Sequence, residues 1–214
     1  MKNLKNFLFI VLPAVFLFSC ASEEDKMKTI ALFNEENLDN WVKFAETDTV
    51  DLDTVWYVQD SVIHCTGNPW GYLRTKESYQ DYKLHVEWRW PEEPGNSGVF
   101  VHVQGDNQLW PTCIEAQLWD RNAGDFVAMG ESDFNERVDK TKRLVQKSAE
   151  TAEVEPGGWN AYDIECFGDS IKLFVNDVLM NVATGVTVTS GDIALQGEGK
   201  PIEFKNVYIE VKEE

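Results

Sequence analysis

The sequence predicts an all-β protein made of two packed antiparallel sheets. Apolar and polar residues alternate repeatedly with a period of two, which is the spacing of a strand with one buried face. Ten or more short strand-like runs occur between turn dipeptides and loops, and no long helical pattern accompanies them. Short strands in that number favour two stacked sheets over one open sheet.

The N-terminal segment precedes these strands and has the features of a lipoprotein export signal. Two lysines stand before an apolar run from Phe7 to Phe18, which is too short to span a bilayer comfortably. The run ends at Ser19-Cys20, a small residue followed by the cysteine that bacterial lipoprotein processing modifies. We therefore expect residues 1–19 to be removed as a signal peptide and Cys20 to carry a lipid anchor.

An acidic stretch follows Cys20 directly and resembles the export tag of surface lipoproteins in Bacteroidetes-like bacteria. We expect residues 20–29 to form a linker and residues 30–214 to form one domain. The expected location is the outer membrane, on the cell surface or facing the periplasm. The lipidated Cys20 is then the only expected contact with the membrane.

Charge argues against two classes of partner. The chain has a net charge of −18, and removal of residues 1–19 takes away two lysines and no acid, which leaves 17 basic and 37 acidic side chains. Nucleic acids and anionic lipid headgroups are poor partners for so acidic a surface. Neutral sugars remain compatible with it.

Three cysteines remain after removal of the signal, and each lies in an apolar strand-like run: Cys65, Cys113 and Cys166. An odd number cannot form a complete disulfide framework, and the sequence has no zinc-ligand spacing. We expect buried free thiols.

Three runs show the alternation most clearly: Tyr82–Trp90, Val99–Val103 and Cys113–Trp119. If these strands lie side by side, their polar faces form one surface, which carries His85, Glu87, Arg89, Phe100, His102, Glu115, Gln117 and Trp119. Such a mixture binds sugars, because rings stack on C–H faces while planar charged groups hold pairs of hydroxyls. Trp70 and Trp110, each next to a proline, are expected in loops that wall the same groove.

Each candidate side chain also has an ordinary structural explanation. Glu87 and Arg89 could form cross-strand ion pairs, which stabilise a sheet by less than about 1 kcal/mol. His102 could be a satisfied histidine at a strand end, and Trp119 could belong to the core. The coincidence of two acids, a histidine and an amide on one expected face favours a site.

The remaining chain continues the strand pattern with one exception. Turn dipeptides divide residues 162–182 into a meander, and two more strands are expected at 193–196 and 202–211. Residues 121–158 are polar and lack strand periodicity, so we expect a long loop insertion there, with one or two helical turns within 135–147. An insertion of this kind is often a binding loop, whereas the ordinary interpretation of its basic cluster is a solvated charged face. The members of the cluster are Lys140, Lys142, Arg143 and Lys147.

Several motifs follow one another with sensible spacing over about residues 30–212: Leu32-Phe33-Asn34 with Asn40-Trp41, Tyr72-Leu73-Arg74-Thr75, Glu87-Trp88-Arg89, Asn96-Ser97-Gly98-Val99, Ile114-Glu115-Ala116-Gln117-Leu118, Trp159-Asn160, and the run from Gly197 to Asn206. Taken together, they resemble the 3-keto-disaccharide hydrolase domain family. The resemblance implies a concanavalin A-like jelly-roll sandwich and an enzyme that acts on glycosides already oxidised at C3.

The chemistry implied by this resemblance is elimination followed by hydration. A C3 ketone acidifies the hydrogen on C2, so a positioned carboxylate or imidazole can remove it and expel the C1 substituent. We expect Glu115 or His102 as the base, with Glu87 as a further catalytic candidate. Arg74 or Arg89 would stabilise the enolate, and the residues that position hydroxyls would be Asn96, Gln117 and Glu198.

Two departures from the family pattern bear on the substrate. Glu153-Val154-Glu155-Pro156-Gly157-Gly158 precedes Trp159 where family members often show Glu-Lys-Pro-x-Gly-Glu, and His102 stands where an arginine is frequent. The sequence requires no cofactor. A divalent cation held by His102 and Glu115 is compatible with their chemistry, although no spacing demands it.

Two other functions fit the same residues. A glucanase-type glycoside hydrolase would use two carboxylates about 5 to 9 Å apart, and the run from Glu115 to Asp120 lacks the second glutamate of that arrangement. A non-catalytic carbohydrate-binding lipoprotein also fits, because a fold does not fix an activity. The expected partners are a glycoside or oligosaccharide, beside sugar-uptake or oxidoreductase proteins.

Overall fold

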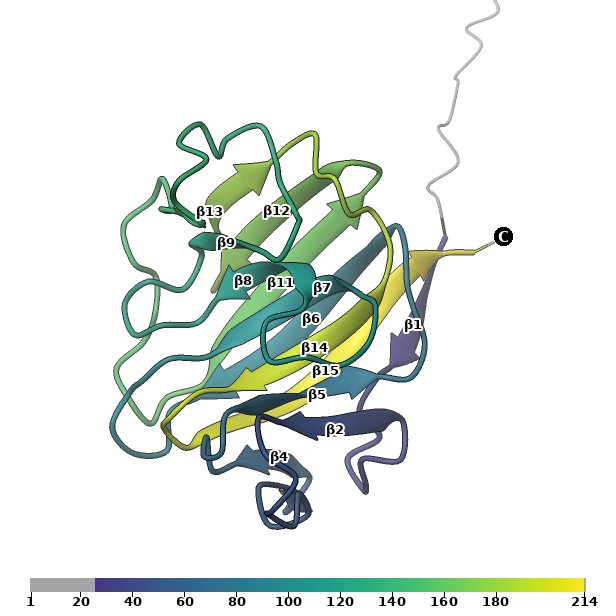
Figure 1. The fold of residues 1–214 in the computed structure, drawn as a ribbon, viewed down its shortest axis with the longest axis vertical. Coiled ribbons are helices and arrows are strands. Elements are labelled where there is room, and N and C mark those ends of the chain that lie inside the picture. The colour runs from purple at the N-terminus through teal and green to yellow at the C-terminus, as the bar shows by residue number, and fades with distance from the viewer. Residues whose placement is uncertain (1–25, 214) are drawn as a thin grey trace, which may run out of the picture.

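Two antiparallel sheets stack face to face in the computed structural model, which describes residues 26–213. In Figure 1 one sheet lies in front of the other, so the strands of the two layers overlap in the view. The prediction of an all-β chain with two packed antiparallel sheets is confirmed. No helix occurs within residues 26–213, so the helical turns expected within 135–147 are absent.

One sheet has eight strands in the order β13-β12-β11-β6-β15-β4-β3, with β1 paired to β15. Its strands are β1 (Met27–Ala31), β3 (Trp56–Gln59), β4 (Val62–Cys65), β6 (Tyr82–Arg89), β11 (Asn160–Phe167), β12 (Ser170–Val175), β13 (Val178–Ala183) and β15 (Ile202–Lys212). The expected meander is the hairpin series β11-β12-β13, which its turn dipeptides connect.

The other sheet has seven strands in the order β10-β9-β8-β7-β14-β5-β2. They are β2 (Trp41–Ala45), β5 (Gly71–Thr75), β7 (Gly98–Gln104), β8 (Thr112–Gln117), β9 (Phe126–Met129), β10 (Leu144–Val145) and β14 (Asp192–Gly197). The strands β9 and β10 fall within the stretch 121–158, so the expected insertion extends this sheet as well as looping over it.

The core lies between the sheets, because each period-two strand turns its apolar side chains inward. Leu84, Val86 and Trp88 of β6 share one buried cluster with Val101 of β7 and Ile114 of β8. A smaller apolar cluster lies on the outer face of the seven-stranded sheet, and its buried members are Tyr72, Phe100, Val103, Cys113, Val127, Met129 and Ala194. This sheet is therefore apolar on both faces at its centre, and loops cover the outer one.

A β-bulge at His102 changes which face the end of β7 presents. The register with β8 shifts between Val101 and Gln104, and His102 has a positive φ of 59°. Because a bulge inserts an extra residue, Val101 faces the core between the sheets while Val103 joins the outer cluster. The strict alternation expected through Val103 is therefore wrong, and so is the expected outward direction of His102.

The expectation that three alternating runs lie side by side is wrong for the first of them. The strands β7 and β8 are neighbours, but β6 lies in the opposite sheet between β11 and β15. The loop after β6, which precedes Gly98, carries the chain from one sheet to the other. Alternation shows that each strand has a polar face, but it does not show which sheet the strand joins.

The predicted signal peptide, the lipidated Cys20 and most of the acidic linker fall outside the described residues. Met27 to Thr29, expected at the end of the linker, belong to β1. Within residues 26–213, the structure contains no helix of the length and apolarity that a membrane crossing needs. The three described cysteines are buried free thiols, as predicted.

Candidate active site

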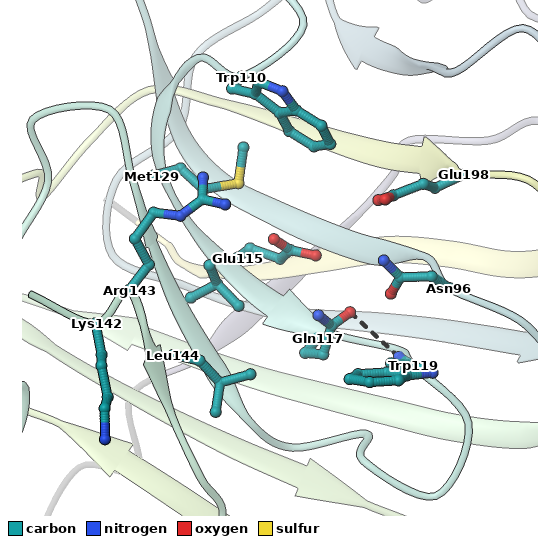
Figure 2. A pocket seen from close by; sticks show the side chains of 11 residues that line it. Asn96, Trp110, Glu115, Gln117, Trp119, Met129, Lys142, Arg143, Leu144 and Glu198 are labelled. Atoms are coloured by element: carbon teal, nitrogen blue, oxygen red, sulfur yellow. Dashed lines mark hydrogen bonds between the residues drawn. The ribbon is translucent and has the colours of Figure 1, made fainter.

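A cavity of about 440 Å³ lies on the outer face of the seven-stranded sheet, in the size range of small-molecule sites. Strand β8 forms its floor, β9 and β10 form one wall, and the loops before β7 and after β14 form another. Its lining residues, shown in Figure 2, are Asn96, Trp110, Glu115, Gln117, Trp119, Val127, Met129, Lys142, Arg143, Leu144 and Glu198. Six of these were candidate site residues from the sequence.

Glu115 stands in the middle of the cavity floor. Its cross-strand neighbours are Phe100 on β7 and Val127 on β9, so apolar side chains flank it on both adjacent strands, and the residue is only 4% exposed. Burial raises the pKa of Glu115 to about 8, repulsion from Glu198 adds to the increase, and attraction to Arg143 opposes it. When ionised, this carboxylate is a stronger base than an ordinary one.

Glu198 brings a second carboxyl group into the same cavity (Figure 2). It follows the end of β14, where Gly197 is required because a Cβ there would lie 2.4 Å from Cys65 Sγ. Gln196 Nε2 donates a hydrogen bond to Glu198 Oε2 at 2.8 Å, and Asn96 forms a second hydrogen bond. Burial raises the pKa of Glu198, while these hydrogen bonds and the charge of Arg143 oppose the increase.

Gln117 and Asn96 supply neutral hydrogen-bonding groups beside the two acids. Gln117 Oε1 accepts hydrogen bonds from the backbone N–H groups of Leu118 and Trp119, at 3.0 and 3.2 Å. These bonds fix the amide so that Nε2 is left to donate into the cavity (Figure 2). Asn96 Oδ1 is buried and accepts no hydrogen bond from the described part of the chain. The cavity thus offers an amide donor to sugar hydroxyls, and the carboxylate oxygens beside it can accept from them.

Tryptophan rings border the cavity on two sides (Figure 2). Trp119 is 52% exposed and Trp110 is 37% exposed, which is unusual for side chains so large and apolar. Trp70 does not line the cavity but packs edge to face on Trp110, with ring centroids 6.1 Å apart. Exposed rings next to polar groups provide flat surfaces for the C–H faces of a sugar.

Arg143 is the site residue that the sequence interpretation missed. It immediately precedes β10, and its guanidinium group points toward the cavity (Figure 2). Its side chain makes no hydrogen bond or ion pair with any residue between 26 and 213, whereas Lys142 lies 3.8 Å from Asp139. The apolar pair Leu144-Val145, which forms β10, was the one signal that this basic stretch borders a sheet.

Arg74 lies on the same sheet but outside this cavity. Its Nε is 2.5 Å from Asp192 Oδ2, and its Nη1 donates to the carbonyl of Gly105 at 2.9 Å. It lines a separate cavity with Asp106 and Asn107. The expectation that Arg74 stands beside Glu115 is therefore wrong, because β7 and β14 lie between their strands and Arg74 is paired with Asp192 outside this cavity.

Glu87 and Arg89 lie on the outer face of the opposite sheet, so the expected surface shared with Glu115 is wrong for both. Arg89 Nε is 2.5 Å from Glu203 Oε2, and Lys205 Nζ is 3.2 Å from Glu87 Oε2. These are the cross-strand ion pairs of the ordinary structural explanation.

His102 is turned into the space between the sheets, away from the Glu115 cavity. Its ring packs edge to face on Tyr82, with centroids 5.6 Å apart, and its Nδ1 lies 2.8 Å from the carbonyl oxygen of Val188. Burial lowers the pKa of His102. Since His102 and Glu115 face opposite sides of one sheet, they cannot hold a common cation. No cluster of three or more potential metal ligands occurs within residues 26–213.

Comparison with known proteins agrees with this architecture. The family model of the 3-keto-alpha-glucoside-1,2-lyase-like domain matches residues 28–210. No functionally curated protein matches the chain.

Solved structures share the fold at low identity. A candidate glycosyl hydrolase from Parabacteroides distasonis aligns with a TM-score of 0.64 and 21% identity, covering 86% of this chain and 94% of its own. A β-glucanase from Bacillus licheniformis aligns at 0.56 and 14%, covering 88% and 98%. The carbohydrate-binding module CBM66 from Bacillus subtilis aligns at 0.57 and 11%, covering 78% and 93%. The fold is thus the expected concanavalin A-like jelly roll, which both hydrolases and binding modules use.

Proposed function

The chain belongs to the family of 3-keto-alpha-glucoside-1,2-lyase-like domains, and we propose that it cleaves glycosides oxidised at C3 in the Glu115 cavity. The observation that carries this proposal is the position of Glu115, a carboxyl group with a raised pKa on an apolar floor between hydrogen-bonding amides. Carbon acids need a strong base, and general bases work best when their pKa lies near the operating pH.

Glu115 removes the proton from C2 in the first step. The electron pair of the broken C2–H bond forms a C1=C2 double bond as the substituent on C1 departs, and negative charge develops on the C3 oxygen during the transfer. Arg143, which has no partner of its own among residues 26–213, stabilises that charge from the cavity wall. Arg143 thus has the role, stabilisation of the enolate, that the sequence assigned to Arg74 or Arg89.

Binding groups hold the sugar over Glu115. Gln117 Nε2 donates to a hydroxyl oxygen, while the rings of Trp119 and Trp110 contact C–H faces. Water then adds to the unsaturated sugar at C1, and C2 regains a proton. Elimination followed by hydration amounts to hydrolysis of the glycosidic bond.

One observation favours a second candidate, a glucanase-type glycoside hydrolase. Although the strand of Glu115 lacks a second glutamate, Glu198 brings another carboxyl group to the same cavity. Two carboxyl groups facing one cavity are the minimum that ordinary glycoside hydrolysis requires. The two functions differ in whether the substrate must carry a ketone.

A substrate comparison decides between these functions. The protein is incubated with lactose or sophorose and, separately, with the 3-keto forms of the same disaccharides. We expect cleavage of the keto forms alone. Cleavage of the parent sugars would establish the glucanase function instead, and calorimetric binding of the keto sugars without turnover would establish a binding protein.

The Glu115→Gln variant ties that activity to the cavity. It should bind the keto disaccharide and fail to cleave it, while Glu165→Gln, on the outer face of the other sheet, should retain full turnover. Full turnover by Glu115→Gln would eliminate Glu115 as the base.

A further inference from the structure

The two carboxyl groups of the cavity come from β8 and from the end of β14, the two strands that flank β7. Glu115 belongs to β8 in the cavity floor, whereas Glu198 follows β14 and enters from the side (Figure 2). We propose that Glu198 is the general acid that protonates the departing glycosidic oxygen, and that Glu115 and Glu198 together hold one proton at the start of each turnover. This inference rests on the proposed function.

The surroundings of the pair favour one shared proton. Glu115 is buried and Glu198 is partly buried, and the negative charge of Glu198 opposes ionisation of Glu115. The nearest unpaired cation of the cavity is Arg143, whose single charge can balance one carboxylate but not two. One positive charge beside two interacting carboxyl groups favours the state in which one group is ionised and the other holds a proton.

The neighbours of Glu198 hold its carboxyl group in a fixed direction. Gln196 Nε2 donates to Oε2 at 2.8 Å, and Asn96 forms the second hydrogen bond. The main chain on both sides is also fixed, because Gly197 packs against Cys65 and Asn96 bridges the backbone of Glu198. An acid that must reach one oxygen of a bound substrate needs such positioning.

No other lining residue is suited to donate this proton. Gln117 and Asn96 carry amides, which do not transfer protons near neutral pH, and arginine remains charged under all relevant conditions. Lys142 extends away from Glu115 in Figure 2 and lies 3.8 Å from Asp139. Besides Glu115 itself, Glu198 is the remaining acid within the cavity lining.

The reaction begins with Glu115 ionised and Glu198 protonated. The glycosidic oxygen accepts a hydrogen bond only from protonated Glu198, so substrate binding selects this form. The C2–H bond breaks and its proton goes to Glu115, while the C1–O bond breaks and its electron pair stays on oxygen. That oxygen takes the proton of Glu198 and leaves as an alcohol.

Hydration reverses both transfers. Glu198, now a carboxylate, accepts a proton from water as the water oxygen bonds to C1. Glu115 returns its proton to C2. Both glutamates regain their starting states, one water is consumed, and no oxidant or reductant takes part.

Leaving groups of different basicity test this assignment. The 4-nitrophenolate group of a nitrophenyl 3-keto-glucoside departs without help from an acid. The methoxide group of the methyl 3-keto-glucoside is a poor leaving group and needs protonation. We expect Glu198→Gln to lower kcat on the methyl glycoside by about 10²- to 10³-fold and on the nitrophenyl glycoside by less than about 10-fold. Glu115→Gln should lose activity on both substrates, because each reaction needs removal of the C2 proton.

Each possible result decides the matter. Equal losses by Glu198→Gln on both substrates, or full activity on the methyl glycoside, would overturn the role of Glu198 and leave the proposed function standing. If the wild-type protein cleaved neither keto glycoside, the proposed function itself would fail and the role of Glu198 with it. Circular dichroism melting of each variant establishes that any loss of activity occurs in folded protein.

Discussion

The carboxyl group of Glu115 lies directly against the backbone of Gly98 on the neighbouring strand. A Cβ atom at position 98 would come within 2.4 Å of Glu115 Oε1 and within 2.9 Å of its Cδ. A Cβ atom does not come within 3.0 Å of a non-bonded heavy atom, so a side chain at position 98 would displace the carboxyl group. The absence of a side chain at Gly98 therefore allows Glu115 to lie in the cavity floor.

The Gly98→Ala variant should therefore displace Glu115 and lose at least about tenfold in kcat, because small misplacements of a catalytic group reduce the rate strongly. Steady-state kinetics on a 3-keto-glucoside measures the effect. Gly105→Asn is a suitable control, since no atom lies within 4 Å of a Cβ at that position and asparagine tolerates its positive φ. Unchanged kcat in Gly98→Ala would contradict the dependence of Glu115 on this contact.

Activity on an aryl 3-keto-glucoside should increase with pH toward a midpoint near 8. Glu115 must be ionised to act as a base, and its pKa of about 8 leaves most molecules protonated at neutral pH. An aryl leaving group is chosen because its departure does not depend on Glu198. A profile of kcat/KM between pH 5 and 10 tests this, and a midpoint near 4 to 5 would indicate an ordinary carboxylate.

Loss of Arg143 should move this profile to higher pH and lower its plateau. The guanidinium group favours the ionised form of Glu115, so Arg143→Met raises the pKa of Glu115 further. The same change removes the charge that stabilises the enolate, and we expect a plateau lower by about 10²- to 10³-fold. Lys142→Met is the matched control and should leave both the midpoint and the plateau nearly unchanged.

Glu115 should also make stability depend on pH. Its folded pKa is raised from 4.5 to about 8, so the folded protein binds a proton there more tightly than the unfolded chain. The resulting stability is present below pH 4.5 and is lost as the pH increases to 8. Glu115→Gln removes this loss and should raise the free energy of unfolding by about 2–4 kcal/mol at pH 8.

The same variant should differ little from wild type at pH 4.5, where the wild-type carboxyl group is neutral. Urea unfolding at both pH values measures the two free energies. An equal effect of the substitution at pH 4.5 and pH 8 would show that the change acts through packing and not through ionisation.

The exposed tryptophans should contribute to substrate binding. Trp119→Ala and Trp110→Ala each remove a flat ring at the edge of the cavity, and loss of one ring contact worth about 1 kcal/mol raises KM several-fold. Trp159→Ala is the control, because its ring contacts Arg89 and Lys205 on the opposite sheet. An increase in KM for the control that matched the other two would argue against a specific role of the cavity rings.

The sequence was sufficient to predict strands and their polar faces, but not how those strands pair. Alternation correctly placed Glu115 and Gln117 on an outer face, since both lie on one strand with an unbroken period of two. It grouped Glu87 with them because sheet membership depends on contacts between distant segments, which a local pattern does not contain. His102 was misplaced for another reason, because one extra residue in a bulge reverses the direction of every later side chain.

Arg143 illustrates a further limit. Composition describes its segment as charged and solvated, which is true for most of its neighbours. Its position in the cavity wall depends on the pairing of the two-residue strand β10 with β9, which a local sequence pattern does not reveal. The Glu198 motif, in contrast, was found through the family resemblance, because the glycines on either side of it make the motif easy to align.

The free thiols at positions 65, 113 and 166 make oxidative folding unnecessary for this sandwich. A protein beginning at residue 26 could therefore be produced in a reducing cytosol without a disulfide catalyst. In that form each remaining cysteine is buried, so a dye that fluoresces on reaction with thiols would not react with the native protein. The dye would react only when the two sheets separate. The rate at which its fluorescence increases therefore measures the rate of opening of the sandwich.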